Sequence, residues 1–263
     1  KFISIGDKGD GSAISKFTKE QLAYDLLSYF GPEYSVLGNH ELYYPACTYL
    51  DPKGENAFVK RGKLKAFLAC NAYMKDETDG TAKYCNYFQP YAIQKIGDLN
   101  VGIVGYAAAK SSIAPNELNV YCADANSDNL FLDTGKTGTQ ILQDAINDCH
   151  EDKLNLNDGV KPDVVILAQH YGVPYTKDEK YDRSKNTFKL ISRINGISAS
   201  LESHTHIKYS LTTPDKDGKI IPMGQAGGYG NALNHLTFKY KTNNKSDCQC
   251  SMEIIDNKLD TKK

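Results

Sequence analysis

Histidine, carboxylate and carboxamide side chains recur in four short segments of this chain. The segments are Gly6-Asp7, Gly38-Asn39-His40-Glu41, Gln169-His170 and Ser203-His204-Thr205-His206, and they hold four of the six histidines. A buried aspartate can bridge two divalent cations, while histidine nitrogens and an asparagine carbonyl complete the coordination without further negative charge. Two ions about 3.5–4 Å apart can share a hydroxide and clamp the oxygens of a phosphate group. The residue types therefore indicate a site for divalent metal ions that accepts phosphate.

Each of these segments follows a predicted strand. Short apolar runs rich in β-branched and aromatic residues predict strands over residues 2–5, 35–37, 65–72, 91–96, 101–106, 163–168 and 197–201. The four segments that follow such runs carry Asp7, Asn39-His40, His170 and His204-Thr205-His206. Because an α/β sheet presents its ligand crevice at the carboxyl ends of its strands, we expect the four segments to converge.

The remaining patterns predict the fold class. Helical spacing of apolar residues predicts helices over residues 19–30, 139–151 and 186–194. After His206 the pattern changes to strands, predicted over residues 207–212, 219–223, 235–240 and 250–255. Alternating strands and helices, followed by antiparallel strands, predict an α/β fold in which two β-sheets pack face to face with helices on the outside.

Length and composition favour one soluble globular domain with a small-molecule ligand. The chain has 263 residues, of which 40% are hydrophobic and 24% are charged. Its formal net charge of -1 gives no electrostatic reason to expect a nucleic acid or an anionic membrane as partner. No apolar run approaches the roughly 20 residues that span a bilayer. The cysteines leave two interpretations open, since Cys70 and Cys85 could close a loop through a disulfide or could be separate thiols.

Taken one at a time, the candidate residues have purely structural explanations. Asp7 is typical of a turn, and its glycine-rich segment lacks the Gly-Lys-Ser/Thr and GxGxxG spacings of phosphate loops. Asn39 could cap a helix, and His170 could be a hydrogen-bonded core residue. His204 and His206 share a face only if the strand stays extended through them. Their joint placement at strand ends favours a metal site over these separate explanations.

In order and spacing, these segments resemble motifs of the calcineurin-like metallophosphoesterases, and more closely those of the N-terminal metal-binding domain of the 5′-nucleotidase family. The matching segments are Gly6-Asp7 with Gly11-Ser12, Gly38-Asn39-His40-Glu41, Gln169-His170-Tyr171-Gly172, Ser203-His204-Thr205-His206, Gln225-Ala226-Gly227-Gly228-Tyr229-Gly230, and Pro90-Tyr91 with residues 101–105. The match covers nearly the whole chain. It implies a four-layer α/β/β/α metallophosphoesterase sandwich for residues 1–263.

The resemblance also implies two divalent metal ions, for which zinc, manganese and iron are the candidates. By motif, Asp7 would bridge both ions, and Asn39, His170 and His204 would complete one of the two sites. The other site would receive Asp7 and His206. Its last two ligands would come from an Asp-x-His motif on a first strand, upstream of Gly6-Asp7, which this sequence does not show.

The implied activity is metal-dependent hydrolysis of phosphate monoesters, above all nucleotides, by a hydroxide that bridges the ions. His40 would be the catalytic residue whose positive charge stabilises the phosphoryl transition state. Alternatives on the same fold are hydrolysis of phosphodiesters, cyclic nucleotides or sulfur esters, and a non-catalytic scaffold with a partial metal site.

Two departures from the family pattern favour the scaffold. Tyr43 stands where many nucleotidases have an aspartate that orients the catalytic histidine, and the upstream ligands are absent. We expect residues 1–263 to lack the family's first strand and its C-terminal substrate-binding domain, and to be inactive on their own. The resemblance places the protein in a secreted, periplasmic or other extracytoplasmic compartment.

Overall fold

A computed structural model describes residues 1–8, 13–42, 49–76, 78–108, 120–173 and 186–257 of the chain. Two features singled out in the sequence lie outside these described residues, namely Gly11-Ser12 of the first motif and Tyr43. In the described part of the chain, no helix is long and apolar enough to cross a membrane.

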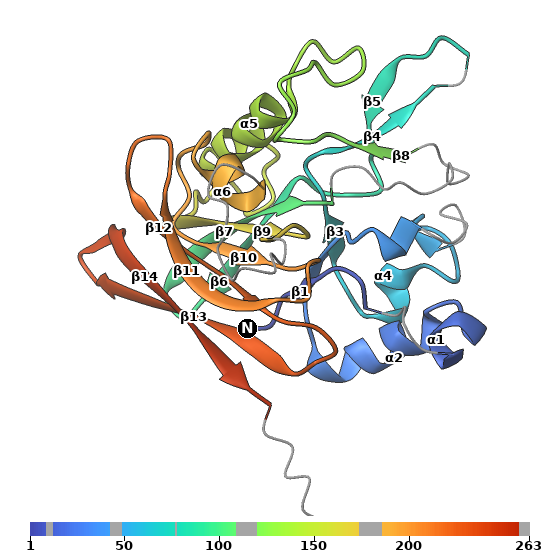
Figure 1. Cartoon of the computed structure of the whole chain (residues 1–263), viewed down its shortest axis with the longest axis horizontal. Coiled ribbons are helices and arrows are strands. Elements are labelled where there is room, and N and C mark those ends of the chain that lie inside the picture. The colour runs from blue at the N-terminus through green and yellow to red at the C-terminus, as the bar shows by residue number, and fades with distance from the viewer. Residues whose placement is uncertain (9–12, 43–48, 77, 109–119, 174–185, 258–263) are drawn as a thin grey trace, which may run out of the picture.

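A six-stranded sheet forms the centre of the molecule (Figure 1). In hydrogen-bonding order its strands are β11 (Lys208–Pro214), β12 (Ile220–Ala226), β10 (Ser200–Glu202), β9 (Val164–Gln169), β7 (Leu99–Tyr106) and β6 (Tyr91–Ile96). The four inner strands run parallel to one another, so their carboxyl ends lie along one edge. Every residue of β9 is buried, as expected for a parallel strand that is covered on both faces.

Two further sheets and a hairpin accompany the central sheet. The second sheet consists of three parallel strands, β1 (Ser4–Ile5), β2 (Tyr34–Val36) and β3 (Ala66–Leu68). The hairpin is formed by β13 (Ala232–Lys241) and β14 (Asn244–Asp256). A three-stranded antiparallel sheet contains β5 (Ala82–Tyr84), β4 (Ala72–Lys75) and β8 (Val120–Cys122).

Helices flank the sheets on their outer sides (Figure 1). They are α1 (Ala13–Phe17), α2 (Gln21–Phe30), the 3-10 helix η1 (His40–Leu42), α4 (Phe58–Arg61), α5 (Gly138–His150) and α6 (Asn186–Ile191). A capping box starts α5, because the side chains of Thr137 and Gln140 each accept the backbone N–H of the other residue. Gly31 ends α2 in a left-handed conformation, with φ of 64°.

Three apolar clusters hold these layers together. The cluster between the central sheet and the second sheet contains Val36 and Leu68 from the second sheet with Ile103 and Ile166 from the central sheet. Another packs α5, through Leu142, and α6 on the central sheet. The last joins α2 and α4 to the second sheet. The layer order is therefore helix, sheet, sheet, helix, which confirms the predicted α/β/β/α sandwich.

The single strand expected over residues 65–72 is wrong, because the chain forms two strands there, β3 and β4, with Asn71 between them. Its buried side chain donates to the carbonyl oxygens of Ala107 and Ala123, at 3.0 Å each, and accepts the N–H of Ala107 at 2.9 Å. These tertiary hydrogen bonds override local strand propensity, and the chain passes from the second sheet into the small antiparallel sheet. The strand expected over residues 197–201 is also displaced, since the observed strand β10 covers Ser200–Glu202.

Cys70 and Cys85, for which a disulfide remained open, are both buried free thiols. Burial raises the pKa of Cys85 to about 11, and burial raises the pKa of Cys70 further. Both thiols are therefore protonated at neutral pH and act as small apolar core residues.

Candidate metal centre

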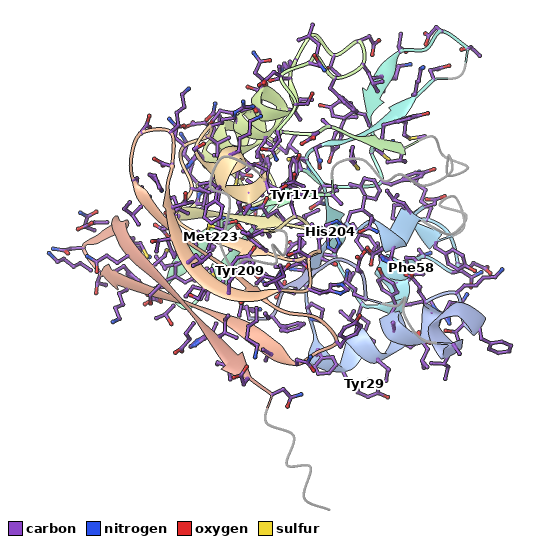
Figure 2. All side chains as sticks on the ribbon, in the orientation of Figure 1. Tyr29, Phe58, Tyr171, His204, Tyr209 and Met223 are labelled. Carbon is purple, nitrogen blue, oxygen red and sulfur yellow. The ribbon has the colours of Figure 1, made fainter. Side chains whose placement is uncertain are left out.

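The carboxyl ends of four strands bring the candidate residues together. Asp7 follows β1, Asn39 follows β2, His170 directly follows β9, and His204 comes two residues after β10. β1 and β2 are parallel neighbours in one sheet, and β9 and β10 are parallel neighbours in the other. Figure 2 shows His204 near the middle of the molecule, between the central sheet and the side that carries Phe58. The site thus lies where the strand ends of the two sheets meet.

Two glycines allow the segments to approach one another. Gly6 has a φ of +74°, and a Cβ atom there would lie 2.4 Å from Nδ1 of His170. A Cβ atom on Gly38 would lie 2.3 Å from Oδ1 of Asp7. Any larger residue would separate the loops, so the Gly-Asp and Gly-Asn-His motifs need glycine for reasons of space.

Three potential ligand atoms surround Nε2 of His170, which is itself the fourth. This Nε2 lies 2.9 Å from Oδ2 of Asp7, 3.2 Å from Oδ1 of Asn39 and 3.3 Å from Nδ1 of His204. The ligand atoms of Asp7, His170 and His204 all lie within 4.8 Å of one another. Two nitrogen ligands of one tetrahedral zinc ion are separated by roughly 3.4 Å, given Zn–N bonds near 2.1 Å. The spacing of the two histidines fits a shared ion.

The hydrogen bond on the far side of His170 sets its tautomer. Nδ1 of His170 lies 2.7 Å from the carbonyl oxygen of Ile5, which can only accept, so Nδ1 carries the proton. Nε2, the nitrogen left to bind a metal, then faces the carboxylate of Asp7, the carbonyl of Asn39 and a nitrogen of His204. A divalent cation among these atoms can take the place of a proton shared between Nε2 and Asp7. A carbonyl that orients a ligating histidine in this way is a regular feature of metal sites.

The charges of Asp7 and His204 also suit a cation. Burial opposes ionisation of Asp7, but the hydrogen bond and charge of His170 and the N–H of His40 outweigh it and lower the pKa of Asp7 to about 2. Loss of hydration and the nearby His170 lower the pKa of His204. Asp7 is thus a carboxylate and His204 a neutral imidazole at neutral pH, which are the ligand forms that divalent ions bind.

The structure places His40 and His206 at the border of this cluster. The backbone N–H of His40 donates to Oδ1 of Asp7 at 2.8 Å, and its Nε2 lies 3.6 Å from Oδ2 of Asp7. His206 is exposed and packs on Tyr229, with ring centroids 5.3 Å apart. Both histidines line a hollow of about 670 Å³ that opens beside Asp7. Asp7, Asn39, His170 and His204 are therefore brought together, whereas His206 lies outside that group.

Several buried polar residues that support the site were not singled out as functional from the sequence. Glu41 accepts the backbone N–H groups of Gly38 and Asp7, at 2.7 and 3.1 Å, and so ties two ligand segments together. Gln169 and Glu202 are buried at the strand ends beside His170 and His204. The available signal was their position, since each is a polar residue next to a candidate ligand or at the end of an apolar strand.

Comparison with known proteins identifies the fold. No protein-family model and no curated protein matches the sequence. Among solved structures, a 5′-nucleotidase precursor from Thermus thermophilus matches with a TM-score of 0.65 and 19% identity, over 97% of this chain and 45% of that chain. The NAD nucleotidase of Haemophilus influenzae matches with a TM-score of 0.60 and 15% identity, over 95% of this chain and 44% of that chain.

A sulfate thiohydrolase from Thermus thermophilus is similar to the same degree, with a TM-score of 0.60 and 17% identity, over 95% of this chain and 38% of that chain. The chain thus spans less than half the length of each of these three proteins. At these identities the likeness shows the fold alone, which this chain shares with the matched parts of the two nucleotidases and the thiohydrolase. The fold implied by the sequence motifs is confirmed.

Proposed function

We propose that this domain holds divalent metal and hydrolyses phosphate monoesters, with nucleotides as the first substrate class. The observation that carries the proposal is the group of electron-rich atoms around Nε2 of His170, which a cation would stabilise. The likeness to solved nucleotidases supports the substrate class.

The described side chains fit one ion well. Asp7, Asn39, His170 and His204 offer two oxygens and two nitrogens, a set that suits zinc, manganese or iron. When bound, such an ion activates water and neutralises charge on a phosphate group. His40 faces the hollow beside Asp7, with 28% of its side chain exposed, so it can reach a phosphate there. A protonated His40 would stabilise the charge that develops on the phosphoryl oxygens.

The second metal position requires ligands beyond these four. His206 lies in the same hollow and is the proposed first contributor. Among the described residues, β1 pairs with β2 alone and β13 pairs with β14 alone. A groove of about 660 Å³, lined by residues 1–6 and 232–236, lies along both strands. We propose that an extended segment paired in this groove would supply the Asp-x-His ligands implied by the motifs.

A metal and substrate assay tests the proposal on the intact protein that contains residues 1–263. We expect metal-dependent phosphate release from nucleoside monophosphates, exceeding release from cyclic nucleotides or phosphodiesters. We expect N39A and H204A to lower metal content, measured by elemental analysis, while far-UV circular dichroism stays unchanged. Wild-type metal content in both variants would overturn the ligand assignment.

A second candidate activity is hydrolysis of a sulfur ester, which the likeness to the sulfate thiohydrolase supports. The same preparation should be given a thiosulfate ester beside the nucleotides. Faster turnover of the sulfur ester would replace the proposed substrate class but keep the metal centre. A protein that binds metal and hydrolyses neither class would be the scaffold.

A further inference from the structure

Glu202 is a buried acid at the base of the metal centre. It is the last residue of β10, lies two positions before His204, and is 2% exposed. In the sheet it is paired with Gln169, the residue directly before His170. One carboxyl group therefore lies between the two strand ends that carry the histidines.

The carboxyl group of Glu202 joins four elements. Its Oε1 accepts hydrogen bonds from Thr187 of α6 at 2.5 Å, from Ser200 of β10 at 2.9 Å and from Gln169 of β9 at 3.0 Å. Its Oε2 accepts the hydroxyl of Tyr209 in β11. These bonds cross-link the sheet at the level of the ligands.

Tyr209 extends the network beyond the sheet. Its hydroxyl oxygen accepts the N–H of Val173 at 3.1 Å, so the segment that follows His170 is tied to Glu202 through one side chain. His170 is thus held on both sides, through Gln169 before it and through Val173 after it. Figure 2 shows Tyr209 on the sheet side of His204.

Burying this polar network costs more free energy than filling the same space with apolar side chains. The carboxyl is surrounded by hydroxyl and amide groups in a position where an apolar residue would avoid desolvation. In addition, Oε1 of Gln169 is buried with no hydrogen-bond partner among the described residues. Polar groups kept in the core at this cost point to a requirement for geometry.

The geometry in question is that of the two ligands. His204 has a φ of +80°, which is unfavourable for a residue other than glycine and requires support from its surroundings. The separation of 3.3 Å between Nε2 of His170 and Nδ1 of His204 depends on the relative position of two strand ends. Glu202 and Gln169 fix that relative position.

We propose that Glu202 is a positioning residue that sets the distance between His170 and His204 and thereby the affinity and geometry of the metal site. The inference rests on the proposed metal centre but not on its substrate. It goes further by assigning the metal affinity to a carboxyl that touches neither the ion nor the phosphate.

Cobalt binding to the intact protein tests the proposal, because the visible absorption of Co²⁺ reports its coordination. We expect E202Q to bind Co²⁺ at least about tenfold more weakly, as changes behind metal ligands commonly do, and to alter the absorption bands. D152N is the matched control, since Asp152 is also a buried carboxyl, 3% exposed, whose partners are backbone N–H groups away from the site. D152N should keep wild-type cobalt affinity and spectrum.

If E202Q does not fold, Y209F provides the second variant, because it removes only the link from Glu202 to Val173. It should also weaken cobalt binding. Wild-type affinity and spectrum in either folded variant would overturn the positioning role. Failure of the wild-type protein to bind Co²⁺ would instead overturn the metal centre, so the two proposals fail separately.

Discussion

Replacing Glu41 by glutamine should destabilise the metal-free protein by about 3–5 kcal/mol, the usual effect of removing one partner from a buried charge pair. Besides the N–H groups of Gly38 and Asp7, the carboxylate accepts the hydroxyl of Tyr24 at 2.8 Å and lies 3.4 Å from Nζ of Lys8. Burial opposes the ionisation of Glu41, yet the charge of Lys8 helps to hold its pKa below the ordinary value.

The size of the effect follows from what glutamine cannot do. Its NH₂ group would face donors in place of one carboxylate oxygen, and each buried N–H left without an acceptor costs about 1–3 kcal/mol. The ammonium group of Lys8 would also lose its partner, and only 5% of that side chain is exposed. Removing the stranded charge as well should therefore recover part of the stability.

Urea unfolding, followed by far-UV circular dichroism, measures these free energies. The double variant K8M/E41Q should be more stable than E41Q alone by at least about 1 kcal/mol, because the two side chains interact directly. The reasoning is refuted if E41Q unfolds within about 1 kcal/mol of wild type, or if the two substitutions are additive.

Three other results are expected. G38A should weaken zinc binding at least tenfold in a competition assay, because its Cβ atom would lie 2.3 Å from Oδ1 of Asp7. Chelation should lower the thermal midpoint, and zinc at 100 times its dissociation constant should restore about 2.7 kcal/mol. Glu33 has a pKa lowered to about 2 through hydrogen bonds from Lys1 and Lys65. A carboxyl whose pKa is lowered on folding stabilises the fold fully at pH values above its ordinary pKa, and this contribution is lost as the pH falls through the lowered pKa. E33Q should therefore reduce the free energy of unfolding by less than about 1 kcal/mol at pH 7, and in urea titrations the difference from wild type should vanish between pH 4.5 and 2.

The strands that carry the site could be predicted because each is a short apolar run followed by a polar break. The strand predicted over residues 91–96 has the same bounds as β6. The strand predicted over residues 163–168 differs from β9 by one residue at each end. Burial on both faces produces an unbroken run of β-branched residues, and that pattern survives in a single sequence. The same reasoning placed Asp7, Asn39 and His170 at converging strand ends.

The position of His206 could not be read in the same way. Alternation in a strand would set His204 and His206 on one face, but β10 ends at Glu202. Both histidines then take positive φ values, +80° and +59°, so the chain turns between them. Likewise, Asn71 redirects the chain through partners 36 and 52 residues away, and no local pattern contains those contacts.

The left-handed backbone at three candidate ligands affects which substitutions evolution is expected to favour in this protein. Asp7, His204 and His206 have φ values of +51°, +80° and +59°, which glycine would adopt with less strain. Selection for stability alone would therefore replace these residues, at a gain of order 1 kcal/mol each. A lineage that abandoned metal should drift toward glycine or asparagine at all three positions, and one that depends on metal should resist that drift. The aligned sequences of relatives thus hold a record of whether metal binding was retained.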